Sequence, residues 1–167
     1  IGEDAILGGP QMWNQGWKQL AGRALEVEKL ELSAVALGLA EAAVADAIEY
    51  AETRVQFGKP IAAHQAIRHA IAEAKTKTLA MRLMLYHAAG LVQARKPSAL
   101  ETSMTKLFCC EGAAEVTLAC QRVMGAYGLS DLTDMVRYVR DAISLPIVGG
   151  SSNMQKNNIA NRLKLAE

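Results

Sequence analysis

The sequence predicts an all-α protein, an antiparallel up-and-down helical bundle. Hydrophobic residues make up 51% of the 167 residues and aromatic residues 5%. Alanine and leucine fill the apolar share, which favours helices over sheet. Apolar residues also recur at three- and four-residue steps over long stretches, the period of amphipathic helices, with glycine and proline between them. Three long helices and two shorter ones pack most economically as such a bundle.

The first predicted helix covers residues 19–54 and ends at the turn Phe57-Gly58-Lys59-Pro60. Apolar residues at steps of three, four and seven mark one face, and the opposite face is apolar as well. We therefore expect this helix to be buried on more than one side. The first face comprises Leu30, Leu37, Val44, Ile48, Ala51 and Val55, and the second comprises Leu32, Val35 and Leu39.

The second predicted helix covers residues 60–95, where Pro97 prevents it from continuing. The pattern Ser98-Ala-Leu-Glu101 predicts a capping box that opens a third helix, which ends at Gly125-Ala-Tyr-Gly128. Shorter helices are expected at about residues 132–142 and 153–163. The stripe of the second helix comprises Ile67, Ile71, Ala74, Thr78, Met81, Leu85, Ala88 and Val92; Met84 and Met104 are further expected core residues, and His69 and His87 are expected to be packed or solvated.

Charge and cysteine usage exclude several classes of function. The formal net charge is +1 and no run of lysine or arginine occurs, so we expect no nucleic-acid partner. No apolar run is long enough for a membrane span, and no signal peptide is visible. The three cysteines, Cys109, Cys110 and Cys120, lack metal-ligand spacing. They predict reduced core thiols and no metal site.

The residues around the first turn suit a phosphate-bearing ligand. Arg54 ends the first helical pattern, and His64-Gln65 lies in the first turns of the next one. An arginine, imidazole and amide groups, and the N–H groups of a helix N-terminus bind phosphate well when they converge.

The string from Arg54 to Gln65, with Phe57-Gly58 inside it, closely resembles the RxxFGxxxxxxQ signature of the acyl-CoA dehydrogenase family. These FAD enzymes desaturate acyl-CoA thioesters. Four further segments are similar to the family in the same order. They are Glu26-Val-Glu-Lys29, Cys120-Gln-Arg-Val-Met-Gly-Ala-Tyr-Gly128, Arg140-Asp-Ala142 and Pro146-Ile-Val-Gly-Gly-Ser-Ser-Asn-Met-Gln155.

The resemblance implies a domain organisation. Residues 19–167 are similar to the family's C-terminal helical domain, and residues 1–18 look like a tail or linker from a missing β-domain. Trp13 and Trp17 are expected to pack against that domain. By itself the chain is then expected to be inactive.

The resemblance assigns FAD contacts to nine positions. Arg54, Gln56, His64 and Gln65 match FAD-contacting positions one by one. Arg122 stands where the family has a glutamine that contacts the FAD of the neighbouring subunit, whereas Gln121 is one residue early. Gly125 also matches an FAD-contacting position, although the next residue, Ala126, replaces a family glycine. Ser151, Ser152 and Asn153 replace the family's Thr-Ser-Glu/Gln, although plain helix capping explains either serine equally well.

The resemblance also implies a reaction, in which a carboxylate removes the proton α to the thioester carbonyl while a hydride leaves the β-carbon. The commonest base is the glutamate of Tyr-Glu-Gly-Thr, but this chain has Val148-Gly149 there. A minority of the family, isovaleryl-CoA dehydrogenase among them, places the glutamate on the first long helix, and Glu28 matches it. The alternative for Glu28 is a solvated carboxylate at a helix start. A glutamate introduced at Gly149 should restore the commoner arrangement.

Two further substrate contacts follow from the resemblance. The backbone N–H of Gly149, followed by Gly150, is expected to bind the thioester carbonyl. Lys29 stands where the family usually has an arginine near the substrate, with a solvated lysine as the alternative.

The implied partners are an acyl-CoA substrate, an electron-transfer flavoprotein or similar acceptor, and further copies in a homotetramer, with a hetero-oligomer as the alternative. The expected compartment is the bacterial cytoplasm, with the mitochondrial matrix as the alternative. Two competing functions stay open. One is a base-less subunit whose partner supplies the glutamate, and the other is a bundle used purely for oligomerisation.

Overall fold

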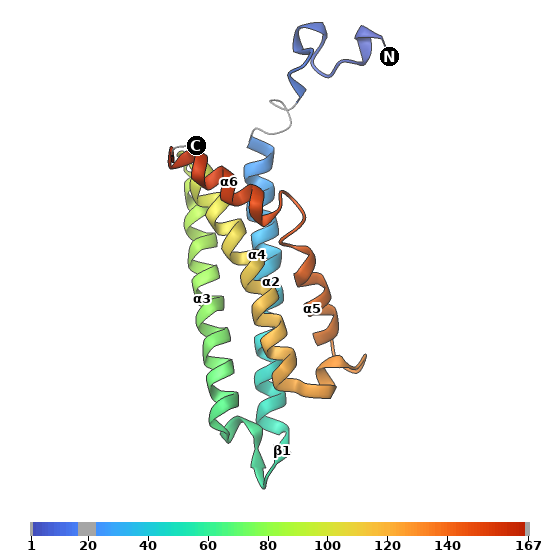
Figure 1. Cartoon of the computed structure of the whole chain (residues 1–167), viewed down its shortest axis with the longest axis vertical. Helices are drawn as coiled ribbons and strands as arrows, with labels where there is room; N and C mark the ends of the chain where they lie inside the picture. Colours follow the sequence, from blue (N-terminus) through green and yellow to red (C-terminus); the bar gives the residue numbers. More distant parts are fainter. Residues whose placement is uncertain (1, 17–22, 166–167) are drawn as a thin grey trace.

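The computed structural model describes residues 2–16 and 23–165, and a bundle of helices dominates it (Figure 1). Three long helices follow one another up and down the bundle: α2 (Arg23–Thr53), α3 (Gln65–Gln93) and α4 (Ala99–Met124). Consecutive ones are antiparallel, so α2 and α4 run in the same direction. Of the shorter helices, α5 (Met135–Ser144) lies alongside the bundle, and α6 (Ser152–Arg162) crosses one end of it. The predicted fold class is therefore confirmed.

The leading segment contains two 3-10 turns, η1 (Glu3–Ala5) and η2 (Pro10–Met12), and neither has a buried residue. Trp13 is exposed, and Trp17 lies outside the described residues. Their packing against another domain stays a prediction.

Helix α4 is the centre of the bundle, since it contacts α2, α3, α5 and α6. Its contact with α2 is the most extensive one, and α2 carries a row of completely buried alanines. Small side chains let two helix backbones approach closely, so a larger residue in this row would overpack the core. The row comprises Ala36, Ala40, Ala43, Ala47 and Ala51.

The two outer long helices largely follow the predicted periodicity. The centre of the α3 stripe is buried, from Ala74 to Ala88. On α2, Leu37 and Val44 are buried, whereas Val55 lies beyond the helix and is exposed. The second apolar face of α2 is partly confirmed, because Leu32 and Leu39 pack against the core although Val35 is exposed.

Helix α4 differs from the prediction in three ways. Ser98 is the N-cap residue but its side chain makes no capping hydrogen bond, so the predicted capping box is wrong. Met104, like Met84 on α3, is half-buried rather than in the core. The core face of α4 is polar in its first part, from Thr102 to the fully buried Lys106, and mainly apolar from Cys109 onward.

The cysteines behave as predicted. Cys109, Cys110 and Cys120 are free and buried. Burial raises the pKa of the Cys109 and Cys120 thiols to about 12 and that of Cys110 to about 11. The thiols are therefore protonated and unreactive at neutral pH.

A short hairpin displaces the start of α3 from the predicted Pro60 to Gln65. Strands β1 (Val55–Gln56) and β2 (Lys59–Pro60) pair antiparallel. Phe57 and Gly58 between them both have positive φ, +54° and +80°, as a two-residue hairpin turn requires. The turn η3 (Ile61–Ala63) then leads into α3, with His64 as its N-cap residue.

None of the helices in residues 2–16 and 23–165 is long and apolar enough to cross a membrane.

Candidate functional site

The predicted site residues gather at the two opposite ends of the bundle. Arg54, Gln56, His64 and Gly125 line a cleft of about 490 Å³ beside the β hairpin. The second cleft, of about 560 Å³, lies near α6 at the start of α2, and its lining includes Glu28, Lys29, Gly149 and Gly150. Helix α2 has 31 residues, so its ends are about 45 Å apart at about 1.5 Å per residue. We call these the hairpin cleft and the α6 cleft.

The hairpin cleft presents polar groups that are largely exposed. A ring nitrogen of His64, Nε2, lies 3.3 Å from the backbone oxygen of Gln56, and the Phe57 ring meets the His64 ring edge-on at 5.9 Å. Across the cleft, Tyr50 stacks on Tyr127 with ring centroids 5.6 Å apart. Within the described residues, the Arg54 guanidinium has no carboxylate partner. Its charge is therefore free to meet an anion.

Two predicted FAD positions lie near this cleft without lining it. Gln65 and Arg122 are exposed, and neither side chain belongs to the cleft wall. Gln121, one position earlier, is half-buried and donates to the Gly128 carbonyl at 3.0 Å. Its amide therefore stabilises the turn η4 (Gly125–Leu129). Ala126 does line the cleft.

In the α6 cleft the backbone of Gly149 lies directly against α2. Gly149 has φ +61°, and a Cβ on it would lie 3.5 Å from Glu28 Oε1 and 2.2 Å from Leu32 Cδ1. Both the positive φ and the contact with Leu32 strain any larger residue. This backbone disfavours a glutamate at Gly149, and the expectation that such a glutamate restores the commoner arrangement stays a prediction.

Beside Glu28 the chain offers unused backbone donors. In the described part of the chain, the N–H groups of Gly149, Gly150 and Ser151 donate to no protein acceptor. By contrast, the Ser152 N–H donates to the Pro146 carbonyl at 2.9 Å. Consecutive free N–H groups before a helix N-terminus suit an anion or a carbonyl oxygen that gains negative charge.

The serines of this segment have structural partners. Ser151 is the N-cap of α6, and its hydroxyl accepts a 3.4 Å hydrogen bond from the Met154 N–H. The Ser152 hydroxyl donates to the Glu111 carboxylate. Asn153 is exposed, and none of the three lines either cleft.

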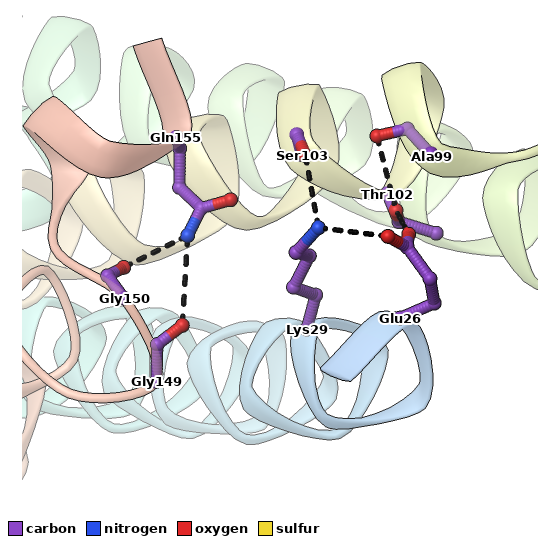
Figure 2. A network of polar contacts seen from close by, with 8 residues as sticks. All are labelled: Glu26, Lys29, Ala99, Thr102, Ser103, Gly149, Gly150 and Gln155. Carbon is purple, nitrogen blue, oxygen red and sulfur yellow. Dashed lines mark hydrogen bonds and ion pairs between the residues drawn. The ribbon is translucent and has the colours of Figure 1, made fainter. Parts of the chain in front are cut away.

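Lys29 is neither solvated nor free. It is 7% exposed, and its Nζ donates to Glu26 Oε1 and Ser103 Oγ, both at 3.1 Å (Figure 2). Thr102 donates to the second oxygen of Glu26. The solvated alternative for Lys29 is therefore wrong, and a substrate contact would have to share an ammonium group that is already paired.

The two glutamates at this end differ in the same respect. Both oxygens of Glu26 are engaged by Lys29 and Thr102. The half-buried Glu28 carboxylate, within the described residues, makes no hydrogen bond or ion pair. Of the two, Glu28 is the one available to take a proton.

Two buried residues that the sequence analysis did not single out hold the turn that carries Gly149. Lys106 on α4 has no exposed surface, and its Nζ donates to the carbonyls of Leu145 and Gly150, each at 2.9 Å. Gln155 on α6, 1% exposed, donates to the Gly150 carbonyl at 2.9 Å and to the Gly149 carbonyl at 3.5 Å (Figure 2). A charged residue on the inward face of a central helix is the signal that could have identified Lys106.

The structure is thus a helical domain with two clefts, which has an arginine without a carboxylate partner at one end and a carboxylate beside unused N–H donors at the other. The chain belongs to the acyl-CoA dehydrogenase family. The family profile described as "Acyl-CoA dehydrogenase, C-terminal domain" matches residues 14–164. The resemblance found in the motifs is thus confirmed.

Related proteins align with most of this chain. An acyl-CoA dehydrogenase of Bacillus subtilis is 38% identical over 79% of this chain, and a short-chain specific one of Megasphaera elsdenii is 36% identical over 84%. The chain spans 35% and 37% of their respective lengths.

Solved structures of related proteins have the same fold as this chain. Butyryl-CoA dehydrogenase from Megasphaera elsdenii matches 90% of this chain with a TM-score of 0.87 and 35% identity, and the chain covers 39% of it. PigA with FAD and proline matches 84% with a TM-score of 0.82 and 29% identity, covering 37% of that chain.

Proposed function

We propose that this chain is the C-terminal helical domain of an FAD-dependent acyl-CoA dehydrogenase, with Glu28 as the catalytic base. The observation that carries the proposal is that a free carboxylate lies beside free backbone N–H donors. The Glu28 carboxylate makes no hydrogen bond or ion pair in the described residues, and the adjoining N–H groups of Gly149 and Gly150 donate to no protein acceptor there. Among the described residues that line the α6 cleft, no other carboxylate is free, since Glu26 is paired.

The α6 cleft supplies what removal of a weakly acidic proton needs. The proton α to a thioester carbonyl is released more readily when donors stabilise the negative charge that develops on the carbonyl oxygen. The Gly149 N–H is placed to do so, and Glu28 beside it takes the proton from the α-carbon. When bound, FAD accepts the hydride from the β-carbon.

The hairpin cleft fits the diphosphate of FAD. The Arg54 guanidinium is free to pair with phosphate oxygens, and His64 and the Gln56 amide lie at the same cleft. Arginine is well suited to this role because its planar donors match phosphate geometry. Gln65 and Arg122, exposed near the cleft, would reach the same ligand only as it extends beyond the wall.

Since the two clefts lie at opposite ends of α2, we assign them to different FAD molecules. Residues 149–153 serve the site that Glu28 completes, and residues 54–65 reach the FAD of a neighbouring copy. This sharing requires an oligomer, for which we propose a homotetramer. Exposed apolar residues on α3, among them Leu79, Leu83 and Tyr86, support association, because large exposed apolar patches favour interfaces.

The proposed partners are an acyl-CoA and an electron-transfer flavoprotein. One relative is the subunit CarC of a caffeyl-CoA reductase–Etf complex from Acetobacterium woodii, 35% identical over 90% of this chain. Relatives occur in bacteria and, in the rat, in mitochondria. We propose the bacterial cytoplasm as the compartment of this protein.

The test uses a hybrid enzyme in which this chain replaces the matching part of the Megasphaera elsdenii short-chain enzyme. Glu28→Gln should lower kcat by about 10²–10⁴-fold, the usual effect of losing a general base, while the flavin content stays unchanged. Glu31→Gln, an exposed carboxylate on the same helix, is the matched control and should leave kcat unchanged.

An unchanged kcat in Glu28→Gln would show that Glu28 is not the base. A hybrid enzyme that is inactive even with Glu28 intact would favour the second candidate, a base-less subunit whose partner supplies the glutamate. The observation that favours this candidate is the absence of a carboxylate at Val148-Gly149. In that case, turnover should require a second, different chain.

A further inference from the structure

We propose that Lys106 is a positioning residue that locks the turn from Leu145 to Gly150 against α2, so that the free N–H groups of Gly149 and Gly150 stay beside Glu28. The proposal rests on the function suggested above for Gly149. It concerns a residue that contacts neither substrate nor cofactor and acts through the backbone of the turn.

The hydrogen bonds of Lys106 span the whole turn. Its ammonium donates at 2.9 Å to the carbonyl of Leu145, where the turn leaves α5, and at 2.9 Å to the carbonyl of Gly150, just before α6. One side chain from the central helix therefore fixes both ends of the segment. Between these two fixed carbonyls, the N–H groups of Gly149 and Gly150 have no protein acceptor among the described residues.

The chemistry explains why a lysine occupies this position. A buried ammonium is unfavourable unless its protons find acceptors, and neutral carbonyls at two points of one turn provide them. Burial lowers the pKa of Lys106, while the charges of nearby acidic groups, including Glu111 and Glu28, oppose this shift. An apolar residue of the same size would leave the Leu145 carbonyl without this buried donor.

Two other elements hold the same turn. Gln155 donates to the carbonyls of Gly150 and Gly149 from α6, and Leu32 on α2 leaves no room for a side chain at Gly149. Of these three residues, Lys106 is charged and holds both ends of the turn. Its removal should therefore loosen the turn while the rest of the bundle stays folded.

The deciding experiment measures amide hydrogen exchange in the 167-residue chain. The N–H groups of Ile147 and Val148, both bonded to the Ser144 carbonyl, and of Ser152, bonded to Pro146, report whether the turn is closed. In Lys106→Met these amides should exchange about 10- to 100-fold faster, as expected for lost hydrogen bonds to a charged group. Amides in the middle of α3 should change much less.

Met81→Ala is the control for a general loss of stability, because Met81 is also fully buried but lies on α3 away from the turn. In this variant the turn amides should change by no more than those of α3. If Lys106→Met speeds amide exchange at the turn and in α3 by the same factor, the positioning role is overturned. Lys106→Gln, which keeps an N–H donor, covers the case in which Lys106→Met fails to fold. It should give an intermediate increase at the turn, and no increase would overturn the proposal.

Turnover of the hybrid enzyme separates this proposal from the one on which it rests. Lys106→Met should lower kcat more than it changes KM, because donors to the developing oxyanion act mainly in the transition state. A loosened turn with unchanged kcat would leave Lys106 as the restraint of the turn and overturn the role of Gly149. A turn that stays closed overturns the role of Lys106 whatever the activity.

Discussion

The two ends of the bundle carry candidate sites that are built differently. The hairpin cleft draws its polar groups chiefly from one short segment, residues 54–64, and these groups are half-buried or exposed. The α6 cleft combines α2, α4, α6 and the turn before α6, and its polar groups are tied together by buried hydrogen bonds. A change at the hairpin cleft should therefore affect ligand binding, whereas a change at the α6 cleft should also affect the fold.

The core between the two ends should produce the largest effect, through pH. Burial raises the pKa of all three thiols above the ordinary value of 9.0, to about 11 or 12. Above pH 9 the unfolded chain loses these protons and the folded chain keeps them, so the free energy of unfolding falls as pH rises, by up to about 1.4 kcal/mol per pH unit for each thiol. The lowered pKa of Lys106 makes the free energy of unfolding rise with pH instead, but this is one group against three thiols.

Urea unfolding between pH 8 and 11 measures this fall. Cys110→Ala removes one of the thiols and should make the dependence on pH less steep. A free energy of unfolding that stays constant from pH 8 to 11 would show that the thiols are not shielded as described.

Lys29→Met tests the buried ties of the α6 cleft. The change leaves the partly buried Glu26 carboxylate without its cation, and we expect a loss of about 3 kcal/mol in the free energy of unfolding. Lys156→Met, an exposed lysine on α6, is the control and should stay within about 0.5 kcal/mol. A loss of less than about 1 kcal/mol for Lys29→Met would place this pair with ordinary surface ion pairs.

Arg54→Met tests the opposite expectation at the hairpin cleft. The guanidinium has no carboxylate partner in the described residues, so the free energy of unfolding should change by less than about 0.5 kcal/mol. In the hybrid enzyme the affinity for FAD should fall about 10- to 100-fold, the typical loss of hydrogen bonds to a charged group. A variant that unfolds more readily yet binds FAD normally would reverse the contrast between the two clefts.

Gly38→Ala should give the smallest effect, and in the stabilising direction. Gly38 lies in α2 between the two ends, is exposed, and has open space where a Cβ would be. Alanine there should raise the free energy of unfolding by about 0.5–1 kcal/mol, because glycine loses more backbone entropy in a helix. Thermal unfolding monitored by circular dichroism is sufficient, and a lower midpoint would indicate an unseen contact at this position.

The sequence determined the helices and the hairpin cleft, because both depend on residues close together in the chain. Periodicity of three and four residues located α2 and α3, and the turn residues Phe57 and Gly58 separated them. Arg54, Gln56 and His64 follow one another within that turn. Local order therefore sufficed to predict that they meet.

The tertiary structure alone decided which polar groups of the α6 cleft are paired and which are free. Apart from the family resemblance, Glu26 and Glu28 are similar carboxylates two positions apart in the sequence. In the structure, Lys29 and Thr102 engage the first and leave the second free. Likewise, Lys106 in the first half of α4 finds its two carbonyl acceptors only because the turn before α6 folds over it. These roles arise from contacts between residues distant in the chain, and burial then determines which polar groups are paired and which stay available for a ligand.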